Sequence, residues 1–297
     1  MNCKSTNEHG QRHMTNGQIA ATIIVMVLWG VNFLAVKETV DYLPPFLAVG
    51  IRFAAVGLCL IPFAPYPKGK TKPLINAGLL LGVGHFGLLF FGMRYVEVGV
   101  ASVVNRIGGV VLAILGVVLL GEIVSLRLWL GLALSMVGVV VLVAENQTLE
   151  VSLAATNSYG VAILLVSSSI WSFATVYMKN SLSNVSTLCQ LAWVAIYSVP
   201  GCLLLSLVFE VNQLSAIMSA PAGAWMGLVY TVVGSSLAAY GIWYELVKRC
   251  EVSKLSAFLF LMPIVGVVIG MMVRGESLTW MKLLGTALIL YAMKLLI

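Results

Sequence analysis

The stretch QIAATIIVMVLWGVNFLAV, residues 18–36, decides the fold, because it contains no charged side chain. A helix needs about 20 predominantly apolar residues to cross the hydrocarbon core of a bilayer. The apolar residues form a continuous run rather than alternating with polar ones, which argues against a strand of a transmembrane barrel. The stretch therefore predicts a membrane-spanning helix.

The rest of the chain has the same character. Its 297 residues are 60% hydrophobic and 9% charged, with a mean hydropathy of +1.02, whereas soluble domains carry about 25% charged residues. This composition excludes a soluble catalytic domain, a disordered chain and a coiled coil, and predicts an all-α integral membrane protein. Ten runs are long enough to span: 18–36, 44–64, 73–93, 98–120, 126–144, 157–179, 186–208, 222–246, 252–273 and 277–297.

The positive charges predict the orientation of these spans. Lys and Arg gather at one set of span ends, in clusters such as 68–72 and 248–254, and cytoplasmic ends carry such an excess. We therefore expect both termini in the cytoplasm, with residues 1–17 as a cytoplasmic tail rather than a signal peptide. The net charge of +6 is spread along the chain without a basic stripe, so no nucleic-acid partner is expected.

The two halves of the chain resemble each other. LWGVNFLAVK at 28–37 matches IWSFATVYMK at 170–179, and Gly121-Glu122 matches Gly275-Glu276. Five spans are an odd number, so the second half enters the membrane upside down relative to the first. We expect two five-helix inverted repeats, 18–144 and 157–297, around a central cavity, an arrangement typical of transporters that work by alternating access.

The chain lacks the motifs of enzymes and ATP-driven pumps. It contains no His-Glu-x-x-His, no Gly-x-Ser-x-Gly and no phosphate-binding loop. Its five cysteines lie far apart and form no Cys-x-x-Cys pair, so we expect neither a disulfide framework nor a metal site. No enzyme activity and no cofactor are predicted, and a gradient of substrate or of an ion, with protons a candidate, must drive any transport. A monomer is the expected oligomeric state.

Charged and polar residues inside the spans indicate where a substrate binds. All acidic residues fall at or near span ends, which disfavours a carrier of lipophilic cations. Arg106, beside Asn105, lies deep in its span, where its guanidinium needs an acceptor: a substrate carboxylate or phosphate, or a helix carbonyl. Arg52 either binds substrate or anchors its span at the outer interface, and His85 either contacts substrate, carries a proton or packs between helices.

Aromatic residues form the second candidate group. Trp29 and Trp171 occupy corresponding positions in the two halves, and Tyr240 and Trp243 share one face of a helix. They either line a pocket, joined by Asn32, or belong to the packed core. A further residue, Pro263, is expected to kink the middle of its span and is a candidate hinge.

Several motifs resemble one known family. WGVNF at 29–33, LPPFLAVGIRF at 43–53, the two Gly-Glu pairs and YGIW at 240–243 make the chain similar to the EamA family of the drug/metabolite transporter superfamily over residues 18–297. Within the family, YGIW and LMPIVG at 261–266 resemble the bacterial inner-membrane exporters of O-acetylserine and cysteine. The resemblance implies a ten-helix bundle that exports small metabolites, while Arg106 stands where an uncharged polar residue is expected and favours a more anionic substrate.

Three hypotheses follow. The first is a secondary transporter in the bacterial cytoplasmic membrane that exports amino acids or similar compounds by alternating access. The alternatives within the same superfamily are a phosphometabolite or nucleotide-sugar exchanger and a multidrug exporter. A structural or sensory membrane protein without transport activity is a third class.

Overall fold

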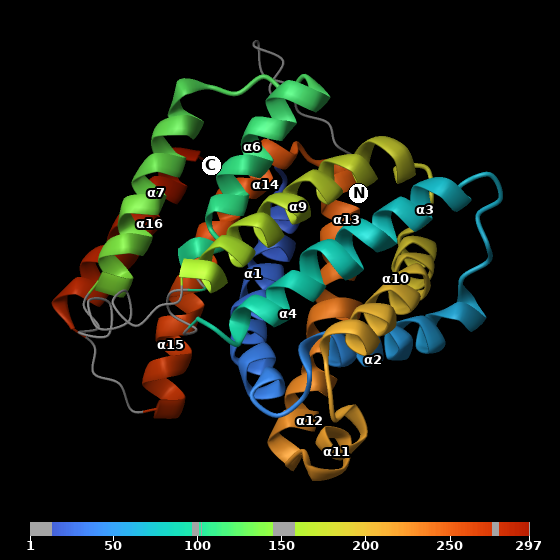
Figure 1. The fold of residues 1–297 in the computed structure, drawn as a ribbon. Helices are drawn as coiled ribbons and strands as arrows, with labels where there is room; N and C mark the ends of the chain where they lie inside the picture. Colours follow the sequence, from blue (N-terminus) through green and yellow to red (C-terminus); the bar gives the residue numbers. More distant parts are fainter. Residues whose placement is uncertain (1–13, 97–100, 102, 145–157, 275–278, 297) are drawn as a thin grey trace.

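The fold is taken from a computed structural model that describes residues 14–96, 101, 103–144, 158–274 and 279–296. Throughout these residues the regular elements are helices (Figure 1). Six helical stretches are long and apolar enough to cross a membrane: Asn16–Val40, Pro45–Phe63, Thr71–Met93, Ser158–Leu182, Thr187–Phe209 and Ala222–Arg249. Shorter apolar helices account for further predicted spans, and the total of ten stays a prediction.

The first half begins with the uninterrupted helix α1. Thr15 accepts a hydrogen bond from the Gln18 backbone, and the Gln18 side chain accepts one from Thr15, which fixes the start of α1. Helix α2 starts at a proline, and Glu210 caps it by accepting hydrogen bonds from the Phe46 and Leu47 N–H groups. The elements are α1 (Asn16–Val40), α2 (Pro45–Leu60), η1 (Ile61–Phe63), α3 (Thr71–Gly78), η2 (Leu79–Gly87), α4 (Leu88–Met93), α6 (Ile107–Leu120) and α7 (Leu126–Ala144).

The second half repeats this pattern of long and interrupted helices. A short helix, α11, occupies the segment between the seventh and eighth predicted spans, which the sequence treats as a loop. The elements are α9 (Ser158–Leu182), α10 (Thr187–Phe209), α11 (Gln213–Ser219), α12 (Ala222–Tyr230), η3 (Thr231–Ala239), α13 (Tyr240–Arg249), α14 (Val252–Phe258), η4 (Leu259–Leu261), α15 (Met262–Arg274) and α16 (Trp280–Leu296).

Helices from the two halves pack against each other in matching pairs. Helix α2 packs on α10 and α7 on α16, while α1 packs on α12 and η3 and α9 packs on η2 and α4. In Figure 1, α7 and α16 form a separate pair on one side, and α1, α6 and α14 lie near the centre. The start of α1 and the end of α16 lie toward the same end of the bundle, the upper end in Figure 1.

Close helix contacts rely on glycine. A Cβ at Gly82 would lie 2.2 Å from the Cβ of Ser198 on α10, and one at Gly227 would lie 2.6 Å from the Ala35 carbonyl oxygen on α1. Small residues let helices approach where lipid supplies no hydrophobic driving force. These contacts hold the two halves together around the centre of the bundle.

Two predicted spans are not the continuous helices that the sequence suggests. The span 98–120 is interrupted by a turn at Asn105 and Arg106, and α6 begins only at Ile107. The span 252–273 is interrupted by the 3₁₀ turn η4. Pro263 follows this turn in the first turn of α15, where a missing backbone N–H costs no helical hydrogen bond. Pro263 has no N–H to donate to the carbonyl four residues earlier, so the interruption lies where the proline predicts it, while the hinge role stays a prediction.

Two other spans contain wide turns. Nine-residue π-helices, η2 and η3, lie in the middle of the third and eighth predicted spans. π-Helices close on i→i+5 hydrogen bonds, are rare and are frequent at functional sites. Both of them contribute side chains to the cavity described next.

Candidate substrate-binding site

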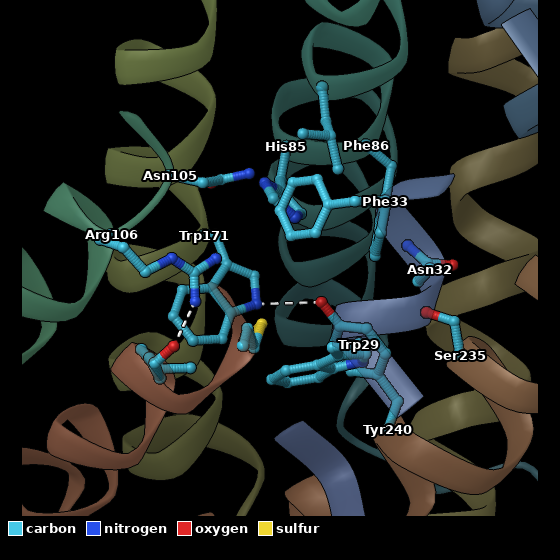
Figure 2. Close-up of a pocket in the computed structure, with 13 residues that line it drawn as sticks. Trp29, Asn32, Phe33, His85, Phe86, Asn105, Arg106, Trp171, Ser235 and Tyr240 are labelled. Carbon is cyan, nitrogen blue, oxygen red and sulfur yellow. Dashed lines mark hydrogen bonds between the residues drawn. The ribbon is translucent and has the colours of Figure 1, made fainter. Parts of the chain in front are cut away.

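A cavity lies at the centre of the bundle, where α1, the two π-helices and the two interrupted spans meet. The space free of protein atoms is about 470 Å³, including its opening to solvent. None of the described residues that line it is acidic. The lining consists of Trp29, Asn32, Phe33, His85, Phe86, Leu89, Asn105, Arg106, Trp171, Ser235, Tyr240, Leu259 and Met262 (Figure 2).

Four aromatic residues, Trp29, Trp171, Tyr240 and Trp243, form what we call the aromatic floor. The Trp29 ring centroid lies 5.9, 4.9 and 5.1 Å from those of Trp171, Tyr240 and Trp243. Trp171 Nε1 donates a hydrogen bond of 2.9 Å to the Tyr240 hydroxyl. Trp243 is fully buried behind the other three rings rather than lining the cavity. The floor is a rigid apolar surface that suits the apolar part of a small substrate.

Arg106 stands on one side of the cavity beside Asn105 (Figure 2). Its side chain is 3% exposed, and Nη1 donates a short hydrogen bond to the Leu259 carbonyl in η4. The guanidinium carbon also lies 5.7 Å from the Phe33 ring centroid. Of the acceptors expected from the sequence, the helix carbonyl is thus present, and it belongs to the interrupted helix of the other half.

His85 and Asn32 add polar groups to the wall. His85 Nδ1 lies 3.0 Å from the Ser167 hydroxyl and 3.1 Å from its carbonyl, which ties η2 to α9. Asn32 Oδ1 and Trp29 Nε1 are buried and have no hydrogen-bond partner among the described residues. Buried polar atoms normally have partners, so these two atoms are exceptions among the residues that line the cavity.

Arg52 lies behind the cavity wall and does not reach the outer interface. It is fully buried, and its Nε and Nη2 donate to Ser236 and Ser235 over 2.8 and 3.2 Å. Its guanidinium carbon lies 4.1 Å from the centroid of Phe86, which lines the cavity. The expectation that Arg52 anchors its span at the interface was wrong.

A second polar cluster, which we call the Glu122 cluster, lies where α6 and α9 end. The Glu122 carboxylate pairs with Lys179 at 3.0 Å and accepts the backbone N–H groups of Val252 and Ser253, each over 2.9 Å. Lys179 also donates to the Cys250 carbonyl over 2.6 Å. These bonds join the turn after α6 and the end of α9 to the junction of α13 and α14.

The local sequence explains the position of Glu122. Gly121 ends α6 in the left-handed conformation (φ 65°), which glycine adopts without strain. A Cβ at Gly116 would lie 2.7 Å from Glu122 Oε2, so that glycine makes room for the carboxylate. Burial alone would raise the pKa of the Glu122 carboxyl, but the Ser253 and Val252 donors and Lys179 outweigh it and hold this pKa below its ordinary value.

The structure thus brings most of the candidate residues into one place. Seven of those named from the sequence line the cavity, while Arg52 and Trp243 pack behind it. Sequence reasoning missed Ser235 because it assumed an α-helix, in which residues five apart, such as Ser235 and Tyr240, face different directions. Because η3 is a π-helix, the Tyr240 N–H that follows it bonds to the Ser235 carbonyl, and both residues line the cavity. Phe33 was within the quoted WGVNF motif, and that proximity to Trp29 was an available signal.

An apolar helical bundle around a polar-edged central cavity defines a membrane transporter in fold and site. The model of the EamA-like transporter family matches two segments, 16–144 and 158–297, and the chain belongs to this family. It is therefore a multi-pass membrane transporter rather than an enzyme.

Known relatives and one solved structure also resemble this chain. The chain is 27% identical over 279 residues to a "Probable amino-acid metabolite efflux pump" of Salmonella typhimurium, covering 90% of each chain. It is 22% identical to the "Uncharacterized inner membrane transporter YedA" of Escherichia coli K12, covering 93% of this chain and 89% of that one. A protein of known crystal structure matches with a TM-score of 0.76 at 18% identity, over 95% of this chain and 96% of that one, which shows the fold.

Proposed function

We propose that this transporter exports small amino-acid-like metabolites across the bacterial cytoplasmic membrane by alternating access. The observation that carries the proposal is the buried Arg106 guanidinium at the edge of a central cavity that has an aromatic floor. The efflux pump named among its relatives and the inner-membrane relative support the direction and the membrane. The clusters of Lys and Arg at one set of span ends support cytoplasmic termini.

In this proposal, the substrate carboxylate binds Arg106. A guanidinium presents five N–H donors in a planar fork, and Nη1 already bonds to Leu259. Asn105 adds an amide next to this fork. The apolar portion of the substrate then lies on Trp29, Trp171 and Tyr240.

Transport by purified protein in liposomes tests this function. The panel contains cysteine, O-acetylserine, other amino acids, a sugar phosphate and a quaternary cation, each measured with and without a pH gradient. Saturable movement of the amino-acid-like compounds is expected. Movement of the sugar phosphate alone would support the exchanger instead, and movement of the cation alone would support a multidrug carrier and contradict the role of Arg106.

Substitutions connect the activity to the cavity. Arg106→Ala is expected to lower transport roughly 10- to 100-fold, because a charge-assisted hydrogen bond is worth about 1.5–3 kcal/mol. Arg106→Lys keeps the charge but loses the fork, so it should recover only part of the activity. Arg127, which is exposed at the start of α7, provides the control, and Arg127→Ala should transport normally. Normal transport by a well-folded Arg106→Ala protein would remove Arg106 from the site.

Alternating access requires that the cavity be closed at one end at a time. The Glu122 cluster joins α6 and α9 to α13 and α14 by bonds of 2.6–3.0 Å at one end of the bundle. The end bearing Lys179 is the cytoplasmic one under the orientation proposed above. The bonds support a state closed to the cytoplasm, and their rupture would admit substrate from that side.

Two inverted repeats, 18–144 and 157–297, would provide the second state, which is open to the cytoplasm. In that state each repeat would adopt the conformation that the other has in the closed state. Several features support this part of the proposal: the family model matches each half separately, the π-helices η2 and η3 occupy corresponding places, and each half has one interrupted span. The interruptions at Asn105–Arg106 and at η4 are the natural points at which each span could bend.

The remaining part of the proposed function is the coupling of transport to protons. His85 lines the cavity and bonds to Ser167, so a change in its protonation would alter a contact between η2 and α9. If protons drive export through His85, His85→Gln should keep substrate binding and lose the dependence of transport on a pH gradient. An unchanged dependence in this variant would exclude His85 as the proton carrier.

A further inference from the structure

Arg52 is a buried cation with an unusual set of partners. Its guanidinium makes no ion pair with any acidic side chain in the described part of the chain. Its partners are two serine hydroxyls and three aromatic rings, of which Phe86 is the nearest. Its Nη1 has no hydrogen-bond partner among the described residues. A buried charge normally requires a counter-charge. The position of Arg52 therefore calls for negative charge nearby.

The two serines bound to Arg52 differ in one respect. The Ser236 hydroxyl accepts a hydrogen bond from Arg52 and donates one to the Thr231 carbonyl over 3.0 Å. Its single proton is therefore already engaged within η3. The Ser235 hydroxyl accepts from Arg52, and among the described residues its own proton has no acceptor. Ser235 lines the cavity, whereas Ser236 does not. The Ser235 O–H is thus a donor to the cavity, strengthened by the cation behind it.

The cavity consequently has hydrogen-bond donors on two opposite sides. In Figure 2, Arg106 and Asn105 lie on one side and Ser235 on the other, with the rings of Trp29 and Tyr240 between them. The Arg106 guanidinium lies at the first side and the Arg52 guanidinium lies behind Ser235 at the second. The described lining contains no carboxylate. Both sides favour an acceptor, and a terminal ammonium group placed at the Ser235 side would face the positive charge of Arg52.

We propose that the cavity selects organic acids that carry a second hydrogen-bond acceptor, such as a second carboxylate or an acyl carbonyl. The first carboxylate binds Arg106 and Asn105, and the second acceptor binds the Ser235 hydroxyl in front of Arg52. This inference rests on the proposed function, because it concerns the same cavity and defines its substrate class. Ser235 is the residue that sets the preference.

Three five-carbon acids test the preference, since they differ only at the second end. Glutarate ends in a carboxylate, pentanoate in a methyl group and 5-aminopentanoate in an ammonium group. Binding to the full-length protein in detergent is measured by titration calorimetry, with thermal stabilisation as an independent readout. Glutarate should bind about tenfold more tightly than pentanoate, and 5-aminopentanoate should bind most weakly. Equal affinities, or tightest binding of 5-aminopentanoate, would overturn the proposal.

Substitution of Ser235 assigns the effect to this side of the cavity. Ser235→Ala should lower the affinity for glutarate about tenfold and leave that for pentanoate unchanged, because only glutarate uses the hydroxyl. The control is Ser206→Ala, which removes a buried serine hydroxyl of α10 that has no hydrogen-bond partner among the described residues. It should bind all three acids as the parent protein does. An equal loss for glutarate and pentanoate in Ser235→Ala would show a general change in the cavity and contradict the assignment.

Failure of this inference is distinct from failure of the proposed function. Transport of amino acids in liposomes without a preference for glutarate over pentanoate would overturn the substrate class and leave the exporter intact. Absence of both transport and binding across every compound would overturn both.

Discussion

The two ends of the bundle use corresponding lysines in different ways. Lys179, at the end of α9, pairs with Glu122 at 3.0 Å and donates to the Cys250 carbonyl over 2.6 Å. Lys37, its counterpart in α1, pairs with Asp41 on its own helix at 2.9 Å and donates to the Met93 carbonyl over 3.4 Å. The Lys179 bonds therefore join separate helices by short contacts, while the Lys37 ion pair stays within one helix.

This difference supports the proposal that the end with Lys179 is closed while the end with Lys37 is looser. The side chain of Glu122 is 7% exposed and that of Asp41 is 45% exposed, so water screens the second pair far more. Substitutions in the Glu122 cluster should therefore have larger effects than the matching substitutions in the Lys37 pair.

Removal of the buried carboxylate should have the largest effect. Glu122→Ala should lower the free energy of unfolding by about 3 kcal/mol, because it leaves Lys179 and two backbone N–H groups without their acceptor. Asp41→Ala should lower it by at most about 0.5 kcal/mol. Thermal unfolding of both variants in the same detergent compares them, and equal losses would contradict the contrast between the ends.

Opening of the closed end should expose the thiol at Cys250, which is 8% exposed in the closed cluster. In a protein whose other cysteines are replaced, Lys179→Met should raise the labelling rate of Cys250 by a hydrophilic thiol reagent about tenfold. Such a change corresponds to about 1.4 kcal/mol in favour of the open end. Lys37→Met is the matched control and should label at the parent rate. Labelling that is equally fast in both would show that Lys179 does not hold this end closed.

Pairwise coupling energies should also separate the two lysines. A double-mutant cycle on Glu122 and Lys179 should give a coupling of about 1 kcal/mol, whereas the cycle on Lys37 and Asp41 should give a few tenths, as for exposed pairs within one helix. The free energies come from the same unfolding measurements. A coupling energy near zero for Glu122 and Lys179 would show that their ion pair adds no stability. Glu122 would then stabilise the protein only as an acceptor for backbone N–H groups.

The smallest effect is expected from pH. The pKa of Glu122 is lowered in the folded protein, so its contribution is present above the pKa of an unfolded glutamate, about 4.3, and is lost as the pH falls through the folded pKa. The stability difference between the parent protein and Glu122→Gln should therefore be constant from pH 8 to about 5 and narrow below about 4.3. A difference that widens on acidification would contradict the lowered pKa.

Much of the architecture followed from the sequence, because apolar length dictates membrane helices. The uninterrupted elements α1, α9 and α10 begin and end within four residues of the predicted spans. The interruption at η4 was marked in the sequence by Pro263, which leaves the Leu259 carbonyl without a helical donor. The turn at Asn105–Arg106 could not be predicted, because Arg106 bonds to the Leu259 carbonyl only when the two halves pack together.

For the candidate site too, the sequence predicted some features and only the structure showed others. Intramembrane polarity singled out Arg106, His85 and Asn32, because such groups are costly in lipid and turn inward, and all three line the cavity. The sequence could not distinguish them from Arg52, which packs behind the wall. Whether these residues bind substrate stays a prediction until transport and binding are measured.

The sequence by itself determined that this chain is a helical membrane transporter of the EamA-like family, because composition, span length and motifs are local properties of the chain. Only the tertiary structure decided which side chains share the cavity, since helix rotation, the π-helices and the broken spans depend on contacts between distant segments. Ser235 depends on those contacts most. Its place beside the cavity requires the wide turn of η3 and the buried Arg52 of a different helix.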